Sequence, residues 1–242
     1  LEFGNSAVVD KTFVSARQND LDELNTTDLF KKNATSLRMS EFGYQSSIQE
    51  TLGINYNNLK EFINSIIQGI NTTHQPFEEL GLLDDAGVPQ QISGGILQIE
   101  NELYDCIRPK RAGKSGQRPY QLLKDQGIQY VEVRGIDLNP SSVLGITEDQ
   151  IRVLDLLLIY CIVNDSPEMT DEEKLIIEKT DITTIKYGRE DSSKINYRNS
   201  EIPISQARDH LVENLLLLAN EMDDQEYAKA INLLKIKKNV FN

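Results

Sequence analysis

The residues best suited to chemistry lie within positions 130–140, a segment that has the two-residue period of a β-strand. Successive strand side chains point to opposite faces, so Val131 and Val133 are expected to face a core, while Glu132 and Arg134 share the other face. A carboxylate holds hard cations through oxygen, and a guanidinium grips phosphate or carboxylate with a rigid fork of donors. Together they suit a cleft that neutralises a reacting anion. On spacing alone, a salt-bridged exposed sheet face is the more common arrangement.

Helical patterns dominate the chain around this segment. Apolar residues recur at helical spacing over 57–70, 205–222 and 225–234. Thr147 and Gln150 have the spacing of a capping box, which predicts the start of a helix that continues to about residue 163.

Strands are fewer and are not sequential. Alternation predicts one strand over 97–103 and a second over 128–136, with a basic loop over 108–119 between them. Residues 10–33 are polar and rich in turn formers, which predicts a loop or a short helix. Helices mixed with non-sequential strands indicate the α+β class.

Composition excludes several classes of function. The chain has 242 residues, 39% of them hydrophobic and 26% charged, which is ordinary for a soluble globular protein. A formal net charge of -13 argues against nucleic acid or an anionic membrane as the main partner. The longest apolar run, 153–163, is too short for a membrane span and contains Asp155.

The cysteines and histidines carry no evident site. Cys161 lies in an apolar helical run and is expected to be a small core residue, whereas Cys106 lies near the proposed cleft. Neither cysteine has a partner at metal-ligand spacing. His74 and His210 lie outside every informative segment and are expected to be structural or solvated.

Seven short blocks in a fixed order give the strand segment its context. The chain resembles glutamate–cysteine ligases of the bacterial, gamma-proteobacterial type, which catalyse the first step of glutathione synthesis. The resemblance covers residues 3 to about 169, and its blocks are Ala34-Thr35-Ser36-Leu37-Arg38, Gly43-Tyr44, Leu52-Gly53-Ile54, Leu97-Gln98-Ile99-Glu100-Asn101-Glu102-Leu103-Tyr104, Ile107-Arg108-Pro109-Lys110-Arg111, the Glu132/Arg134 strand with Asp137 and Asn139-Pro140, and Asp165-Ser166-Pro167-Glu168-Met169.

The resemblance implies an ATP-driven ligation in the cytoplasm with Mg²⁺ or Mn²⁺. The γ-carboxylate of L-glutamate would attack the terminal phosphate of ATP, and the amine of L-cysteine would displace phosphate from the γ-glutamyl phosphate. Both steps gather negative charge, which cations and arginines must neutralise. The implied fold is glutamine-synthetase-like, with an antiparallel sheet forming the cleft and helices packed on it.

Roles follow from the resemblance residue by residue. Glu132 matches a metal ligand, while Arg134 and Arg38 match arginines that contact the transferred phosphoryl group. Tyr44 and Tyr104 match tyrosines of the cysteine pocket, although core packing would explain two tyrosines almost as well. The basic cluster near Tyr104 would either attract the nucleotide or simply decorate a loop, and it comprises Arg108, Lys110 and Arg111.

The resemblance begins in the middle of the family. The chain is therefore expected to be an incomplete part of the ligase, central to C-terminal, which lacks the N-terminal half with most metal ligands and is inactive alone. Residues 1–145 would be part of the catalytic domain, and 146–242 a helical region packing on it. Another carboxylate–amine ligase, the ligase half of a bifunctional glutathione-synthesising enzyme, and a non-catalytic interaction module remain alternatives.

Overall fold

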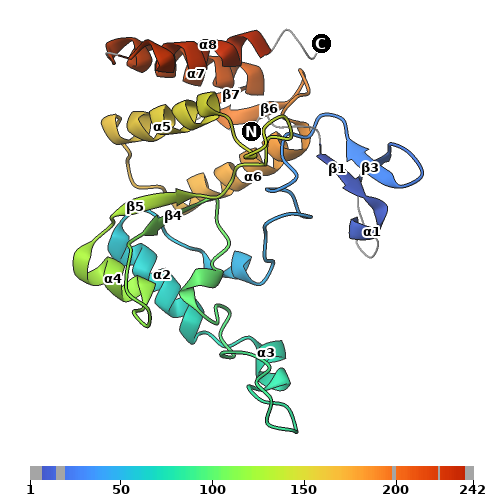
Figure 1. Ribbon diagram of the computed structural model, residues 1–242, viewed down its shortest axis with the longest axis vertical. Helices are drawn as coiled ribbons and strands as arrows, with labels where there is room; N and C mark the ends of the chain where they lie inside the picture. Colours follow the sequence, from blue (N-terminus) through green and yellow to red (C-terminus); the bar gives the residue numbers. More distant parts are fainter. Residues whose placement is uncertain (1–6, 15–19, 198–199, 223, 238–242) are drawn as a thin grey trace. The chain divides into compact units, whose positions relative to one another are not determined.

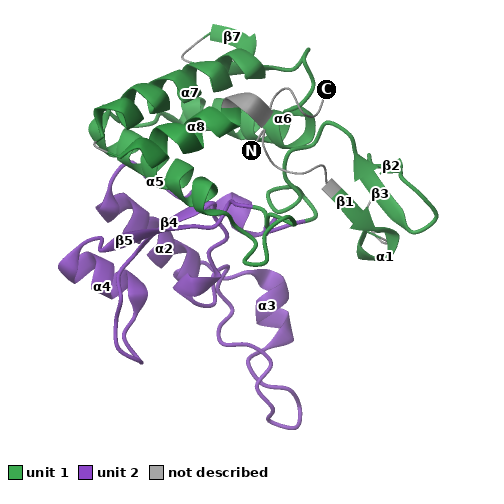
Figure 2. Cartoon of the chain, turned by 45° about the horizontal axis from the view of Figure 1, so that its top comes forward, with its two compact units in different colours: residues 1–42, 137–242 green, residues 43–136 purple. Residues whose placement is uncertain are grey.

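The chain forms two compact units (Figure 2). Unit 1 combines residues 1–42 with 137–242, and unit 2 comprises residues 43–136. The expected division at residue 145 into a catalytic and a helical part stays a prediction. The computed structural model describes residues 7–14, 20–197, 200–222 and 224–237.

Unit 1 begins with a small antiparallel sheet of three strands in the order β1-β3-β2. The strands are β1 (Ala7–Asp10), β2 (Asp22–Glu23) and β3 (Asp28–Lys31), and the short helix α1 (Lys11–Val14) follows β1. The short helix predicted within 10–33 is present as α1, but the prediction missed the strands, of which β2 and β3 lie in that range. They form because Val9 and Val14 bury themselves against Phe42, a contact distant in sequence.

The rest of unit 1 is mainly helical (Figure 1). The helices are α5 (Glu148–Val163), α6 (Asp171–Tyr187), α7 (Ile204–Glu221) and α8 (Gln225–Lys237). A hairpin of β6 (Lys194–Tyr197) and β7 (Ser200–Pro203) lies between α6 and α7 in the chain.

Helices α5, α7 and α8 confirm the predicted helices. The predicted capping box is present, since the Thr147 side chain accepts from the Gln150 N–H and the Gln150 side chain accepts from the Thr147 N–H. The three helices share a core in which Leu156 and Ile231 are fully buried. Cys161 was expected in this core, but it is exposed on α5 and its thiol is free.

Unit 2 packs helices and loops around one apolar core. Its elements are the 3-10 turns η1 (Gln49–Leu52) and η2 (Glu100–Glu102), the helices α2 (Leu59–Asn71), α3 (Gln75–Leu80) and α4 (Pro119–Gln126), and the antiparallel strands β4 (Ile107–Lys110) and β5 (Tyr130–Val133). The core is formed by Leu52, Phe62, Ile63, Ile66, Leu97, Leu103 and Leu123.

The strand predicted over 97–103 is wrong. The segment instead contains η2, because Leu97 before this tight turn and Leu103 after it both pack in the core. The Gln98 N–H donates to the Glu102 carboxylate at 2.8 Å, a local bond that replaces a ladder hydrogen bond. The loop predicted over 108–119 begins later than expected, because Arg108 lies in β4 and pairs with Glu132 in β5.

Strand β5 confirms the predicted strand, but its orientation is the reverse of the prediction. Val131 and Val133 are 41% and 37% exposed, whereas Arg108 on the neighbouring strand is 6% exposed. The two-stranded sheet therefore turns its charged face toward the unit 2 core and its valines outward. The expectation that both valines face a core within this chain is wrong.

None of the helices within the described ranges combines the length and apolar character needed to cross a membrane.

A second ion pair stabilises the core of unit 2. Glu100 is 8% exposed and accepts from Arg118 Nε at 3.0 Å and from Arg118 Nη2 at 2.8 Å. The Arg118 guanidinium also lies over the Tyr120 ring, 5.4 Å from its centroid. Burial pushes the pKa of Glu100 upward, but the hydrogen bonds and charge of Arg118, together with hydrogen bonds from backbone N–H groups, outweigh it and hold the pKa below its usual value.

This balance predicts how stability depends on pH. Because the pKa of Glu100 is depressed on folding, its contribution is present above the ordinary carboxyl pKa of about 4.3 and is lost as pH falls through the folded value. We expect Glu100→Gln to lower the free energy of unfolding at pH 7 by about 1–3 kcal/mol and to weaken the dependence on pH below about 5. Urea unfolding between pH 7 and pH 3 measures both effects.

Glu178→Gln on α6 is the matched control, since the Glu178 side chain is exposed. If Glu100→Gln and the unmodified chain lose stability in parallel on acidification, Glu100 does not carry this dependence.

Candidate functional site

A buried arginine organises the sheet of unit 2. Arg108 Nε and Nη2 donate to Glu132 Oε2 at 3.3 and 3.0 Å. Its Nη1 donates to the carbonyls of Asn101 and Leu103, each at 3.0 Å. With its donors used inside the unit, Arg108 positions Glu132 and the 101–103 segment. The sequence did not indicate this structural role of Arg108.

Arg134 and two tyrosines form a row beside this ion pair. The Arg134 guanidinium lies over the Tyr44 ring, 4.6 Å from its centroid, and the Tyr44 ring lies 4.4 Å from that of Tyr104. The Tyr44 hydroxyl approaches the Leu103 carbonyl at 3.5 Å. The family resemblance, which assigns both tyrosines to one pocket, predicts that they meet although they are distant in sequence, and their ring distance confirms it. Their role in a cysteine pocket stays a prediction.

The electrostatic environment of Glu132 keeps it ionised. Burial pushes the pKa of Glu132 upward, but the hydrogen bonds and charge of Arg108, together with the charges of Lys110 and Arg134, outweigh it and depress the pKa. Lys110 Nζ lies 3.9 Å from Glu132 Oε2, the oxygen that Arg108 also contacts. Glu132 is thus an anion among three cations.

These surroundings do not form a metal site by themselves. Within the described ranges, no group of three or more His, Cys, Asp or Glu side chains is placed to hold a metal ion. Hard cations need six or more oxygen ligands, and Oε2 of Glu132 already accepts from Arg108. Glu132 as a metal ligand therefore stays a prediction that requires further ligands from outside these residues.

In unit 1, the backbone around Arg38 is clamped by one aspartate. Asp137 Oδ1 accepts from the backbone N–H groups of Leu37 and Arg38 at 3.1 and 2.9 Å. Asp137 Oδ2 accepts from the Ser36 hydroxyl, which is fully buried. A carboxylate that satisfies three donors fixes the turn and sets the direction in which the Arg38 side chain leaves it.

The same turn is anchored to the end of helix α6. The Thr35 N–H donates to the Ile185 carbonyl at 2.9 Å, and the Thr35 hydroxyl donates to the Thr184 carbonyl at 2.8 Å. These bonds satisfy carbonyls in the last turn of the helix. At Gly188, just beyond the helix, a Cβ would lie 2.6 Å from Thr35 Cγ2, so the close approach requires glycine.

The remaining residues that the sequence singled out lie at separate positions in the structure. Arg111 donates to the carbonyls of Gly127 and Gln126 at 2.6 and 2.7 Å, and so caps the end of α4. Attraction of a nucleotide by the basic cluster stays a prediction. His74 precedes α3 and its ring meets Phe77 edge-on, while the His210 ring lies 6.2 Å from that of Tyr197. Both histidines thus contact aromatic rings of their own unit.

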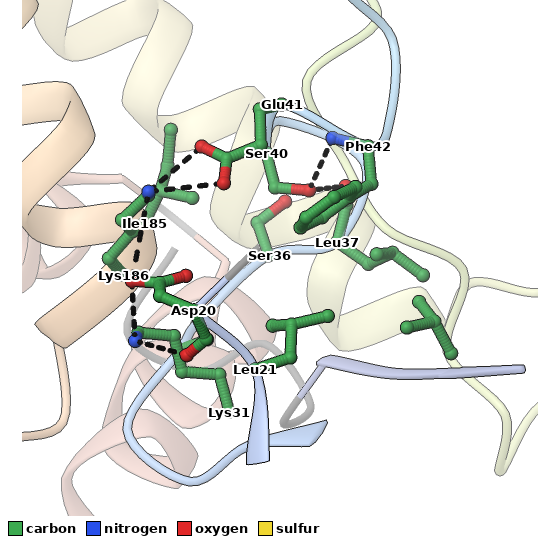
Figure 3. Close-up of a pocket in the computed structure, with 12 residues that line it drawn as sticks. Asp20, Leu21, Lys31, Ser36, Leu37, Ser40, Glu41, Phe42, Ile185 and Lys186 are labelled. Carbon is green, nitrogen blue, oxygen red and sulfur yellow. Dashed lines mark hydrogen bonds and ion pairs between the residues drawn. The ribbon is translucent and has the colours of Figure 1, made fainter. Parts of the chain in front are cut away.

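A pocket in unit 1 lies beside the Ser36 turn (Figure 3). Its cavity of 20 Å³ has room for about one water molecule, which is too little for a substrate. Its charged side chains pair with one another, since Lys31 lies 2.9 Å and Lys186 4.0 Å from Asp20, and Lys186 lies 2.8 Å from Glu41. The ion pairs that line this pocket therefore connect β3 to α6, and the pocket itself is too small for a ligand.

Comparison with known proteins defines the class to which this α+β fold belongs. The chain superimposes on glutamate–cysteine ligase from Francisella tularensis, solved in complex with AMP, with a TM-score of 0.89 and 31% identity over 96% of this chain and 47% of that one. A bifunctional glutathione synthetase from Pasteurella multocida shares the fold at a TM-score of 0.50 and 18% identity, over 84% of this chain and 21% of that one.

Sequence comparison gives the same family. The family model for glutamate–cysteine ligase matches residues 2–183, so the chain belongs to the glutamate–cysteine ligase family. Glutamate–cysteine ligases from Hahella chejuensis and Pseudomonas putida are 37% and 38% identical over 98% and 97% of this chain, and over 46% and 45% of their own lengths. The chain thus spans about half the length of these relatives, and the match extends beyond residue 169, where the blocks of the sequence ended.

The clamp on the Arg38 turn generates a prediction. Asp137→Ala removes the acceptor of two backbone N–H groups and of a buried hydroxyl. We expect the amide hydrogens of Leu37 and Arg38 to exchange at least about tenfold faster, and the free energy of unfolding to fall by about 1–3 kcal/mol. Hydrogen exchange with peptide-level resolution over 34–40 measures the first effect.

Asp165→Ala is the control in the same unit, because Asp165 is exposed on a loop. Unchanged exchange at Leu37 and Arg38 in the Asp137 variant would show that the turn is held by other contacts.

Proposed function

We propose that this chain is part of an enzyme that joins the γ-carboxylate of L-glutamate to the amine of L-cysteine at the expense of ATP. Membership of the ligase family supports the reaction, and the AMP complex of the Francisella tularensis relative supports an adenine nucleotide as substrate. A carboxylate oxygen would attack the terminal phosphorus and release ADP. The cysteine nitrogen would then attack the acyl carbon, lose a proton and release phosphate.

The row of Arg134, Tyr44 and Tyr104 is the observation that carries this proposal. Stacking on Tyr44 holds the guanidinium plane in place, so its donors are pre-organised for the oxygens of a transferred phosphoryl group. Tyr104 is 42% exposed and continues the row to the surface, where it is accessible to a small substrate such as cysteine. Arg108 and Glu132 support the row from the adjacent strand position.

The proposal assigns the second phosphate contact to Arg38. Asp137 fixes the turn that carries Arg38. The assignment of Glu132 to Mg²⁺ or Mn²⁺, the glutamine-synthetase-like sheet and a cytoplasmic location are further parts of the proposal. So is the need for the remainder of the ligase, because the relatives are about twice as long.

The chain by itself is expected not to catalyse ligation. Glu132 alone cannot hold the cations of an ATP site, and the described residues offer no further cluster of ligands. Purified 242-residue chain should release no phosphate from ATP above background when L-glutamate, L-cysteine and magnesium are all present. Steady turnover that depends on both amino acids would show that the chain is sufficient.

Substitution of Arg134 tests the phosphate site in the complete ligase that contains this sequence. Arg134→Lys keeps the charge but loses the planar fork and much of the stacking on Tyr44. We expect turnover to fall by roughly 10²–10³, nearly as far as in Arg134→Ala. Arg152→Lys on α5, which keeps its surface pair with Glu148, is the control and should be near normal. Near-normal turnover of Arg134→Lys would remove the assignment.

Glu132→Gln tests the metal assignment in the same complete ligase. The apparent magnesium requirement should rise more than the KM for either amino acid, since the amide is a weaker ligand for a hard cation. Glu100→Gln breaks a comparable ion pair elsewhere in unit 2 and separates a general loss of stability from a specific effect. An equal change of magnesium dependence in both variants would contradict a ligand role.

A further inference from the structure

The Gln49 side chain holds the backbone that leads into Tyr104. Its Oε1 accepts from the Tyr104 N–H at 2.8 Å, and its Nε2 donates to the Glu102 carbonyl at 2.8 Å. One side-chain amide thus makes the two kinds of bond that a neighbouring strand would otherwise make to this backbone. Residues 103 and 104 belong to no strand in the described structure, so Gln49 satisfies groups that would otherwise need water.

The 3-10 turn η1 determines where this amide points. Side chains three residues apart eclipse each other in such a turn, so Gln49 and Leu52 lie on the same side of η1. Leu52 is buried and packs in the unit 2 core together with Leu103. Gly53 then ends the turn in the left-handed conformation, with a φ of 53°. Burial of Leu52 therefore brings the Gln49 amide to the backbone on either side of Leu103.

Only one orientation of the Gln49 amide fits these partners. In the reversed orientation, Nε2 would face the Tyr104 N–H and Oε1 would face the Glu102 carbonyl, so two donors and two acceptors would meet. A carboxylate at position 49 could accept from Tyr104 but would repel the Glu102 carbonyl. An apolar side chain of the same length could make neither bond. The position therefore requires both the donor and the acceptor of an amide.

Gln49 adds to the contacts that Arg108 makes with the same segment. Arg108 bonds the carbonyls of Asn101 and Leu103, whereas Gln49 bonds the carbonyl between them and the N–H that follows. The Leu103 side chain is buried and that of Tyr104 is exposed, so the segment turns one side chain inward and the next outward. Core packing of Leu103 fixes where the segment lies. The direction in which the Tyr104 side chain leaves it depends on the bond at its own N–H.

The stretch that carries Gln49 also supplies the ring against which Tyr104 lies. Tyr44 comes shortly before Gln49 in the chain, and its ring centroid is 4.4 Å from that of Tyr104. Residues 44–49 therefore contact Tyr104 at both its ring and its backbone. A shift of the Tyr104 backbone moves its ring relative to Tyr44 and alters the surface that the two rings present. A displacement of about 1 Å in a positioning group can cost an enzyme about 10²-fold.

We propose, on the basis of the function proposed above, that Gln49 is a positioning residue for the L-cysteine site of the ligase. Its amide holds Tyr104 against Tyr44 and so shapes the surface that receives the amino acid, without contacting the substrate itself. Arg134 lies over the Tyr44 ring and its backbone is tied to Cys106, so its position does not depend on the Gln49 bonds. Loss of these bonds therefore weakens L-cysteine binding and spares the transfer of phosphate.

Kinetics of the complete ligase that contains this sequence test the role of Gln49. Gln49→Met keeps the length of the side chain but loses both bonds. We expect it to raise the KM for L-cysteine at least about tenfold, while kcat and the KM values for L-glutamate and ATP stay within about threefold. Gln49→Glu keeps only the acceptor and should raise the same KM selectively. Gln68→Met, the same substitution at an exposed glutamine of α2, is the matched control and should be near normal.

Amide exchange in the 242-residue chain reports on the same bonds without any assay of activity. In Gln49→Met the Tyr104 amide should exchange at least about tenfold faster, because its acceptor is gone. The amides of β4 and β5 should keep their protection, which verifies that the variant retains its fold.

Two results would overturn the proposal. The first is unchanged exchange at Tyr104 in Gln49→Met, and the second is a rise of the KM values that is equal for all three substrates. Tyr104→Ala in the complete ligase distinguishes this failure from a failure of the proposed function. If Tyr104→Ala raises the KM for L-cysteine and Gln49→Met does not, only the role of Gln49 is wrong. If Tyr104→Ala also leaves this KM unchanged, the cysteine pocket itself is wrong, and the role of Gln49 is rejected with it.

Discussion

The structure of unit 2 depends on the burial of one guanidinium. Moving a charged arginine out of water costs several kcal/mol unless its donors are satisfied. Arg108 meets this condition by bonding Glu132 on the neighbouring strand and two carbonyls of the 101–103 segment. The sheet must then direct its charged face inward, because Arg108 and Glu132 lie opposite each other on one face. The outward valines follow from this single constraint.

The same constraint determines how Arg134 is presented. Arg134 shares a face with Glu132 at the end of β5, and its backbone N–H is tied to the Cys106 carbonyl. Since the 101–103 segment is held by Arg108, Tyr104 and its neighbour Tyr44 are held with it, and the Tyr44 ring provides a surface for the Arg134 guanidinium. The Arg108–Glu132 ion pair thus orients the arginine and the tyrosines that are proposed to contact substrate.

Much of the helical structure could be predicted from local sequence, because capping and periodicity are local signals. The Thr147 capping box and the apolar stripe of α2 are examples. Helix α6 was missed although Thr170 and Glu173 form a second capping box, since exposed Leu175, Ile177 and Ile182 blur its apolar face. The facing of β5 could not be predicted, because alternation defines two faces but only the distant carbonyls at 101 and 103 decide which one is buried.

In the candidate site, too, the sequence indicates residue types but not where the fold places them. The pairing of Glu132 with Arg134 was visible in the sequence, whereas the role of Asp137 was not, since its three donors lie about 100 residues earlier in the chain. The segments that carry the family resemblance contain both kinds of residue. Thr35 and Ser36 are fully buried and bind backbone and carboxylate partners, and Asn139 donates to Gln150 at 2.9 Å in the capping box of α5. In these segments the family motif therefore specifies how the chain holds its turns, and the candidate arginines and tyrosines take their positions from that framework.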